Sequence, residues 1–235
     1  CAAITPDHTE DFTTFLPTCW EEGDNTDIAT GPNNTNGGWG ADGFLNVGTT
    51  GAARINLWNT GDQDWIVSPT FDLSAGSYGI SFDVGVTAYA ATGPSGMGSD
   101  DEVQLLISSD NGANWTNLQT WNAGNVPSNT GDVIAIDLSA YTSATTKFAF
   151  WATEGTTDDA EDYDFFIDNF IVRTPPVCLE PLTLTATNIT DTTADLGWTS
   201  GGSGESAWEI VVQAAGSGAP AGSGTPTGVN PYNAA

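Results

Sequence analysis

Residues 163–172, Y-D-F-F-I-D-N-F-I-V, constrain the fold more than any other stretch of this chain. Aromatic and β-branched residues at this density are typical of a strand buried on both faces, and Pro175 and Pro176 stop it from continuing. The stretch therefore predicts the closing strand of a β domain. Because an unpaired buried carboxylate is costly, Asp164 and Asp168 either cap turns and face water or bind a cation.

Strand patterns fill most of the remaining sequence. No segment of ten or more residues has apolar positions at helical spacing, whereas short apolar runs alternate with Gly, Asn, Asp and Pro. About ten short strands in the first three quarters of the chain predict an all-β fold, a two-sheet jelly-roll sandwich. The expected strands are residues 8–15, 43–47, 53–57, 65–67, 76–88, 102–108, 116–121, 132–137, 147–153 and 165–172.

The long loop at 21–40 and the segment after Pro175 differ from this pattern. The loop is rich in Asp, Asn and Gly, and loops of this length are usually functional or ordered by a metal ion. After Pro175, strands are expected at 183–189, 194–199 and 208–214. Residues 178–235 are about half of the roughly 100 residues of an immunoglobulin-type sandwich. We therefore expect a first domain at 1–174 and an incomplete second domain at 178–235, with its remaining strands beyond Ala235.

The charge of the chain excludes several partners. Thirty Asp and Glu residues face three basic residues, Arg54, Lys147 and Arg173, for a formal net charge of -27. Such a surface repels nucleic acids and anionic membranes, and no run is apolar enough for a membrane helix. Divalent cations or a neutral ligand such as a glycan fit better. The scarcity of Lys, with abundant Gly, Thr, Ser, Asn and Trp, favours an extracellular location, although residues 1–7 show no signal peptide.

The three cysteines leave one without a partner. Cys1 and Cys19 flank the first expected strand and its turn, and a disulfide between them would tie down the N-terminus. The alternatives are free buried thiols or, for Cys1, a lipid-modified terminus. Cys178 lies at the domain junction, and its partner is expected outside this segment.

Aromatic residues are a second surplus, with nine Trp in the chain. Most should be core, because a packed indole buries a large apolar area. Trp39 and Trp58 lie near Gly- and Asn-rich turns. We expect these two to be exposed and to bind ligand, since a flat aromatic face can stack on a sugar ring.

The order of several motifs resembles a known family. These motifs are T-E-D-F (9–12), L-P-T-C-W (16–20), D-W-I-V-S-P-T-F-D-L (64–73), S-D-D-E-V-Q-L-L-I-S-S-D-N-G-A-N-W (99–115), I-D-L-S-A-Y (136–141) and F-I-D-N-F-I-V (166–172). In this order, residues 1–174 resemble the MAM-like jelly-roll domains related to the cleaved-adhesin modules of large secreted proteins of Bacteroidetes-type bacteria. Residues 178–214, with L-x-A-T-N-I-T-x-T-x-A-x-L-x-W (184–198), resemble the first strands of a fibronectin type III domain.

The resemblance implies modules of adhesins or of secreted hydrolases, many with structural calcium. It also implies that the first and last strands of the domain are neighbours. Related jelly rolls often have a Glu ligand directly after the Phe of the first strand, but this chain has Thr13 there. A calcium ion at this position would take Glu10, Asp11 and Asp168 instead.

Two further acidic groups are candidates for calcium, which binds six to eight oxygen ligands. Asp100 and Asp101 precede one expected strand, and Asp158, Asp159, Glu161, Asp162 and Asp164 crowd into seven residues. Neither follows the spacing of an EF-hand loop. Solvated acidic loops remain the alternative for both. From these groups, Asp101 and Asp164 join Glu10, Asp11 and Asp168 as predicted metal ligands.

Catalytic motifs are absent from the sequence. His8 is the sole histidine, and no G-x-S-x-G or H-E-x-x-H motif occurs. We therefore expect a non-catalytic extracellular adhesion or display module, calcium-stabilised and part of a longer chain. Its expected partners are neighbouring domains of that chain and surface glycans or proteins. The alternative is a carbohydrate-binding module that serves a secreted polysaccharide-degrading enzyme.

Overall fold

The computed structural model describes residues 1–61, 63–175, 180–201, 206–214 and 222–234. The chain divides into two compact units, Cys1–Pro175 (unit 1) and Pro176–Ala235 (unit 2). Cys178 lies outside the described residues, so its pairing stays a prediction. Among the described residues, no helix is long and apolar enough to cross a membrane.

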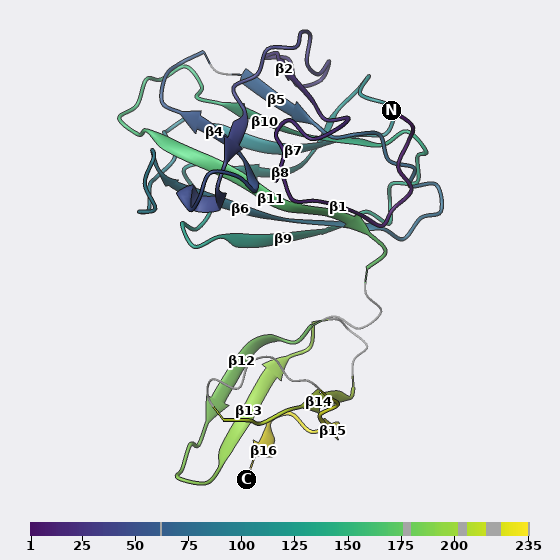
Figure 1. Ribbon diagram of the computed structural model, residues 1–235, viewed down its shortest axis with the longest axis vertical. Coiled ribbons are helices and arrows are strands. Elements are labelled where there is room, and N and C mark those ends of the chain that lie inside the picture. Colours follow the sequence, from purple (N-terminus) through teal and green to yellow (C-terminus); the bar gives the residue numbers. More distant parts are fainter. Residues whose placement is uncertain (62, 176–179, 202–205, 215–221, 235) are drawn as a thin grey trace. The chain divides into compact units, whose positions relative to one another are not determined.

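Unit 1 is a sandwich of two antiparallel sheets, which Figure 1 shows as two layers. This confirms the predicted all-β class and agrees with a jelly roll. The first sheet has the order β3 (Gly40–Asp42), β4 (Ala52–Leu57), β11 (Tyr163–Arg173), β6 (Gly79–Ala88) and β9 (Asp132–Asp137), with β1 (His8–Glu10) also paired to β11. The second sheet has the order β2 (Glu21–Asp24), β5 (Gln63–Val67), β10 (Lys147–Thr153), β7 (Glu102–Ser108) and β8 (Thr116–Trp121).

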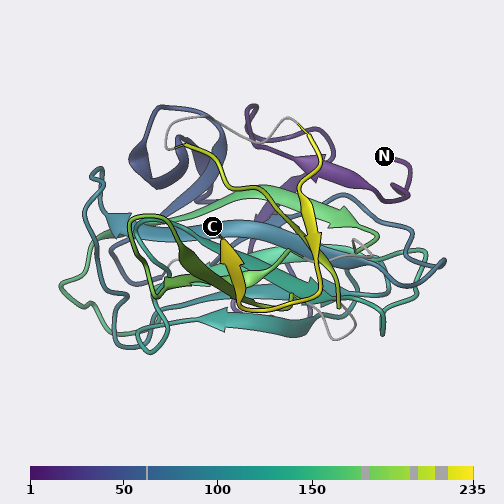
Figure 2. The ribbon, with the colours of Figure 1, turned by 90° about the horizontal axis from the view of Figure 1, so that it is seen from below.

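The strand β11 lies in the middle of the first sheet, as its apolar density predicts. Figure 2 shows it in green beside blue β6, which pairs with it along most of its length. On its other side, β4 pairs with residues 163–167 and β1 with residues 170–172. The expectation that the first and last strands of the domain are neighbours is therefore confirmed. Its side chains from Tyr163 to Ile167 are all buried.

Two clusters of apolar side chains hold the sandwich together. The larger fills the space between the sheets, where aromatic rings such as Phe82, Phe150 and Phe165 meet Trp121 at centroid distances of 5.6–6.5 Å. The smaller lies on the second sheet and contains Trp65, Trp115 and Trp151. Such buried rings contribute a large share of the stability.

The loop that follows β2 covers this smaller tryptophan cluster. Asn25 closes the turn with its side-chain amide, which donates to the carbonyl of Gly31 at 2.6 Å. The indole nitrogens of Trp65 and Trp151 both donate to the Asn25 carbonyl at 3.0 Å. Residues 25–31 are thus ordered by protein groups, and the tryptophans beneath them are not available to a ligand.

Two expected strands take another form. Only His8–Glu10 of 8–15 is a strand, because the carboxylates of Glu10 and Asp11 accept hydrogen bonds from the N–H groups of Phe12 and Thr13 and turn the chain. Residues 43–47 were expected as a strand, but Phe44–Asn46 form a short 3-10 helix (η1). A Cβ at Gly85 would lie 2.2 Å from Leu45, so the missing side chain in β6 makes room for η1.

Unit 2 contains two small sheets. β12 (Leu182–Thr187), β13 (Ala194–Thr199) and β16 (Tyr232–Ala234) form one, and β14 (Trp208–Ile210) and β15 (Thr225–Thr227) form the other. Every described residue of this unit is half-buried or exposed, and Leu184 is 75% exposed. The described part of unit 2 therefore has no closed core.

Candidate functional site

Two exposed aromatic side chains lie at one end of the first sheet of unit 1. Trp58 follows the last residue of β4 and Tyr89 follows the last residue of β6, and these strands pair with β11 from opposite sides at Tyr163. Trp58 is 56% exposed and Tyr89 is 52% exposed. Because neighbouring strands lie 4.7–4.9 Å apart, the two backbones are about 10 Å apart across β11. We call this pair the aromatic surface.

Polar groups of Asp162 and Asn56 adjoin the two strand ends. The backbone N–H of Tyr89 donates to the carbonyl of Asp162 at 3.1 Å. The side-chain amide of Asn56 donates to the Asp162 carboxylate at 2.9 Å. The aromatic surface thus combines two apolar rings with an amide and a carboxylate, the combination that binds a neutral polar ligand.

The two tryptophans that were predicted to be exposed differ in their exposure to solvent. The exposure of Trp58 is confirmed, but the prediction for Trp39 is wrong, since Trp39 is only 4% exposed. Its ring lies 6.5 Å from Phe150 in the core, and its indole N–H points to the carbonyl of Asp64 at 3.4 Å. The cause is β3, which starts at the next residue and pairs with β4. The other five tryptophans of unit 1 are buried as expected: Trp20, Trp65, Trp115, Trp121 and Trp151.

A first acidic group lies where β1, β6 and β11 meet, and we call it the strand-edge group. Asp168 is directly opposite Asp83 in the β11–β6 pair. Burial, followed by the charges of Asp83 and Asp11, raises the pKa of Asp168 to about 6. Glu10, opposite Phe170, also has a raised pKa because of burial and the adjacent Asp11. The structure therefore brings the predicted ligands Asp11 and Asp168 within electrostatic reach and adds Asp83, which the sequence analysis did not identify.

A second acidic group joins two loops, and we call it the loop group. Asp100, Asp101 and Asp159 each place a carboxylate oxygen within 4.8 Å of the others. Asp101 is 1% exposed and accepts hydrogen bonds on Oδ2 from the Tyr163 hydroxyl at 2.7 Å and the Gly98 N–H at 2.9 Å. Burial raises the pKa of Asp101, and the charges of Asp159 and Asp100 raise it further.

Asp164, also predicted as a metal ligand, lies apart from both groups. Its side chain is 1% exposed, and Oδ1 lies 3.2 Å from the guanidinium of Arg54. Its Oδ2 accepts from the amide of Asn46 at 3.0 Å and from the N–H of Ala90 at 2.9 Å. Arg54 thus supplies the positive charge that the sequence analysis assigned to a cation, and we leave Asp164 out of the metal proposals.

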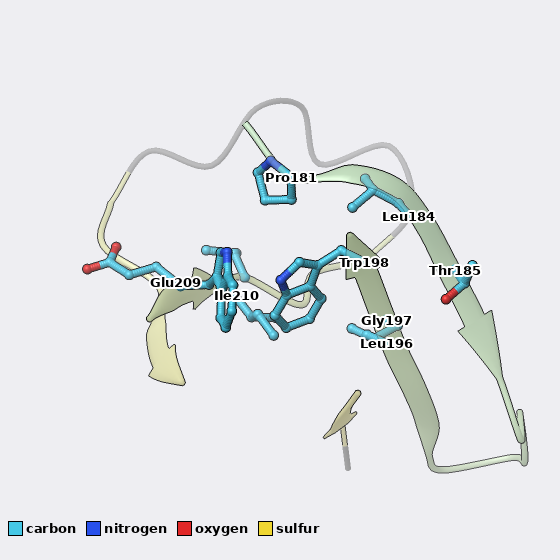
Figure 3. A pocket seen from close by; sticks show the side chains of 10 residues that line it. Pro181, Leu184, Thr185, Leu196, Gly197, Trp198, Glu209 and Ile210 are labelled. Carbon is cyan, nitrogen blue, oxygen red and sulfur yellow. The ribbon is translucent and has the colours of Figure 1, made fainter. Parts of the chain in front are cut away.

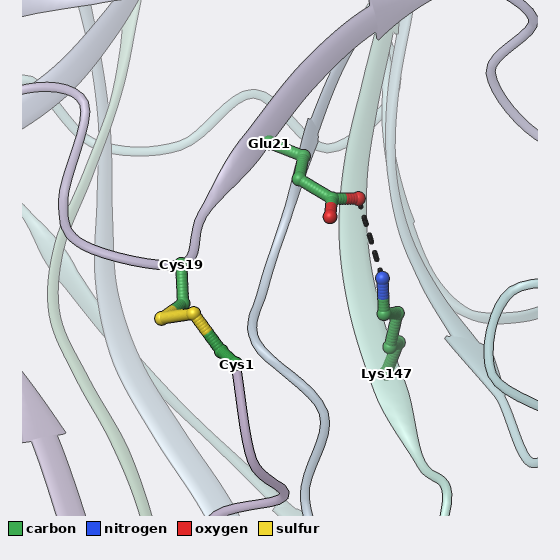
Figure 4. Close-up of a disulfide and its surroundings, with 4 residues drawn as sticks. All are labelled: Cys1, Cys19, Glu21 and Lys147. Atoms are coloured by element: carbon green, nitrogen blue, oxygen red, sulfur yellow. Dashed lines mark hydrogen bonds and ion pairs between the residues drawn. A yellow bond between two sulfur atoms is a disulfide. The ribbon is translucent and has the colours of Figure 1, made fainter.

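The predicted disulfide is present. Cys1 and Cys19 are bonded, with 6.0 Å between their Cα atoms, and beside them Lys147 forms an ion pair with Glu21 at 3.2 Å (Figure 4). The bridge fixes the N-terminal segment to the start of β2. Disulfides persist in oxidising compartments outside the cytosol.

Unit 2 has an apolar hollow of about 270 Å³. Figure 3 shows residues that line it, with the Trp198 ring turned into the hollow. The rings of Trp198 and Trp208, which also lines the hollow, have a centroid distance of 5.3 Å. The lining is predominantly aliphatic and aromatic, with Leu184, Leu196 and Ile210 on its walls. Such a surface resembles one half of a sandwich core more than a site for a polar ligand.

Comparison with known proteins gives structural likenesses only. No protein-family model matches the sequence, and no curated protein matches it. A cleaved adhesin domain of Lys-gingipain from Porphyromonas gingivalis is 18% identical with a TM-score of 0.45, covering 73% of this chain and 99% of that one. The module TmCBM61, solved in complex with β-1,4-galactotriose, is 16% identical with a TM-score of 0.41, covering 68% and 90%.

The N-terminal cellulose-binding domain of β-1,4-glucanase C from Cellulomonas fimi is 11% identical with a TM-score of 0.37, covering 68% of this chain and 91% of that one. At these values the similarities assign neither a family nor a ligand to this chain.

Proposed function

We propose that this chain is a non-catalytic extracellular binding module of a larger protein, and that unit 1 mediates adhesion by binding neutral glycans at the aromatic surface. The observation that carries the proposal is the contrast among the tryptophans of unit 1. Six are buried, whereas Trp58 is exposed and is matched across β11 by exposed Tyr89. Exposed apolar side chains that lie together, unlike single ones, mark interaction surfaces.

The charge and the disulfide support this proposal. With a net charge of -27, the module repels anionic ligands, so an uncharged ligand is favoured. The oxygens of the Asn56 amide and the Asp162 carboxylate next to the two strand ends can accept hydrogen bonds from hydroxyls. The Cys1–Cys19 bond supports an extracellular location.

Two features support a role without catalysis. The sole histidine, His8, packs its ring edge-on against Phe71 at a centroid distance of 5.4 Å, and burial lowers its pKa. Next to the aromatic surface, the Asp162 carboxylate accepts a hydrogen bond from the amide of Asn56, whereas glycoside hydrolysis uses a pair of carboxylic acids on either side of the scissile bond.

Two parts of the sequence-based hypothesis remain proposals of the same account. We propose that calcium binds the strand-edge group through Glu10, Asp11 and Asp168, with Asp83 as a fourth carboxylate. We also propose that the exposed apolar side chains of unit 2, such as Leu182 and Leu184, contact neighbouring domains of the same long chain, because an isolated domain seldom leaves such a surface bare.

Binding to a panel of neutral oligosaccharides and polysaccharides, followed by calorimetry, tests the proposal. A loss of about 1.4 kcal/mol of binding free energy, on the scale of one aromatic contact, weakens binding tenfold. Trp58→Ala and Tyr89→Ala should therefore each reduce the affinity roughly tenfold. Val133→Ala, which truncates another exposed apolar side chain, should leave it unchanged. Equal affinities for all three variants, or no binding to any glycan, would refute the glycan proposal.

The same aromatic surface favours a second candidate, a carbohydrate-binding module that serves a polysaccharide-degrading enzyme. The two candidates differ in the ligand. Affinity for isolated plant or algal polysaccharides supports the accessory module, whereas affinity for the glycans of cell-surface glycoproteins supports adhesion.

A further inference from the structure

The loop group contains a buried oxygen without a partner. Asp101 lies directly before β7, and its side chain is 1% exposed. Its Oδ2 holds two donors, but Oδ1 is buried and has no hydrogen-bond partner. Buried polar atoms are nearly always satisfied, and a bound water or ion is one explanation for an exception.

The neighbours of this oxygen are acidic rather than basic. One carboxylate oxygen each of Asp100, Asp101 and Asp159 lies within 4.8 Å of the other two. The ion pairs of Arg54 and Lys147 are with Asp42, Asp164 and Glu21. Among the described residues, no ion pair places a basic side chain in the loop group. The buried charge of Asp101 therefore has no counter-charge from the protein.

Local backbone structure holds the three carboxylates in place. Asp100 accepts hydrogen bonds from the N–H groups of Thr156 and Thr157 at 2.9 and 3.2 Å, and Asp159 accepts one from the N–H of Ser99. The loop before β7 and the loop between β10 and β11 are thus pinned together through their acidic residues.

At two glycines the backbone packs closely against the carboxylates of the loop group. A Cβ at Gly98 would lie 2.7 Å from Asp101 Oδ1, and a Cβ at Gly155, which has φ of +72°, would lie 2.6 Å from Asp100 Oδ1. Both glycines therefore permit a close approach of backbone and carboxylate that no other residue allows.

We propose that Asp100, Asp101 and Asp159 form a calcium site that joins the loop before β7 to the loop between β10 and β11. Calcium binds oxygen ligands at about 2.3–2.6 Å, so ligands on opposite sides of the ion are about 5 Å apart. Oxygens within 4.8 Å of one another are therefore close enough for one calcium ion to bridge them with small side-chain adjustments. Mg²⁺ requires a near-ideal octahedron, whereas calcium accepts irregular sets of oxygen ligands, so we propose calcium.

The site is independent of the glycan proposal and differs from the strand-edge group. It lies at Tyr163, the first residue of β11, whereas Asp168 lies five residues further along that strand. A cation bound here would hold the loop residues between Asp159 and Asp162 in place. This would be so whether or not the aromatic surface binds a ligand.

Calcium binding to the whole chain can be measured by calorimetry and by terbium luminescence, for which Tyr163, hydrogen-bonded to Asp101, is a well-placed donor. Asp159→Asn keeps an acceptor for the Ser99 N–H but removes a charged ligand. We expect this variant to bind calcium at least about tenfold more weakly and to lose tyrosine-sensitised terbium emission. Asp158→Asn, the same charge change at an exposed neighbour, should retain both. Asp168→Asn removes a proposed ligand of the strand-edge group and should retain only the tyrosine-sensitised emission of the loop group.

The possible outcomes separate the alternatives. Selective loss of the tyrosine-sensitised emission in Asp159→Asn, with a smaller calcium-dependent rise in melting temperature than in the unaltered chain, supports the proposal. Equal losses in Asp159→Asn and Asp158→Asn would show only general electrostatic attraction and overturn it. Loss of the tyrosine-sensitised emission in Asp168→Asn but not in Asp159→Asn would place that cation in the strand-edge group and overturn the proposal. Absence of calcium binding by the unaltered chain would also overturn it.

Discussion

Removal of the Arg54 side chain should destabilise unit 1 more than removal of any other basic side chain. Arg54 lies on β4, and its guanidinium is the positive group beside Asp164 Oδ1 at 3.2 Å. In the variant Arg54→Met, the aliphatic stem remains, but the buried carboxylate loses its counter-charge. The amide of Asn46 and the N–H of Ala90 still contact Oδ2, so the loss falls on Oδ1.

The magnitude follows from burial. Breaking a buried ion pair by removing one partner costs about 3–5 kcal/mol. Asp164 is 1% exposed, but Arg54 is 29% exposed, and solvent screening places the expected loss near the lower end, at about 3 kcal/mol. For a unit of this size, 1 kcal/mol corresponds to roughly 2–4 °C, so the melting temperature should fall by about 6–12 °C.

Urea unfolding followed by tryptophan fluorescence measures this loss, because six tryptophans of unit 1 are buried. Arg173→Met is the matched control, since it removes the same charge at the exposed end of β11. The double variant Arg54→Met with Asp164→Asn should lose less than the sum of the single variants. Equal stabilities of the Arg54→Met and Arg173→Met variants would refute the assignment of Arg54 as the counter-charge.

Three further predictions concern other parts of unit 1. Replacement of Cys1 and Cys19 by Ser should lower the unfolding free energy by about 3 kcal/mol, because the bond closes a loop of 18 residues, and a reducing agent should change only the unaltered chain. The pKa of Asp168 is raised to about 6, so the folded state binds this proton more tightly than the unfolded state does. Protonation of Asp168 therefore contributes to the free energy of unfolding below about pH 4, and this contribution is lost as the pH rises to 6. The unaltered chain in EDTA should therefore lose unfolding free energy between pH 4 and 7, and Asp168→Asn should remove about 1 kcal/mol of that loss, after allowance for solvent screening. The same pH dependence of the unfolding free energy in both proteins would contradict this. Asn25→Ala should release the turn that covers the tryptophan cluster. The variant should lose about 1 kcal/mol of unfolding free energy, and acrylamide should quench its tryptophan fluorescence more strongly. Unchanged quenching would show that other contacts hold the turn.

The sequence predicts strands well where apolar alternation is long. β7, β8, β9 and β10 begin and end at the predicted residues, because each has a regular pattern between turn residues. The short strands β2 and β3 were missed, since their compositions, E-E-G-D and G-A-D, carry no strand pattern. Pairing with β5 and β4 determines their conformation, and a single sequence does not show which strands are neighbours.

The candidate sites depend even more on long-range pairing. Trp39 and Trp58 have similar local surroundings in the sequence, but β3 draws Trp39 inward, whereas Trp58 lies past the end of β4. Tyr89 was missed because its position opposite Trp58 follows from the registers of β4 and β6 with β11. Alternation in β6 indicates that Asp83 is on one face, but only pairing with β11 places it beside Asp168.

The most direct test of the binding proposal is heteronuclear NMR of the labelled chain, titrated with the neutral oligosaccharide that binds best. The indole N–H of Trp58 and the backbone amides of Tyr89 and Asp162 should shift in proportion to occupancy. The indole N–H of Trp65, bonded to the Asn25 carbonyl beneath its loop, should stay in place. Shifts confined to Trp198 and Trp208 of unit 2, or no shift in unit 1 at saturating ligand, would contradict the account.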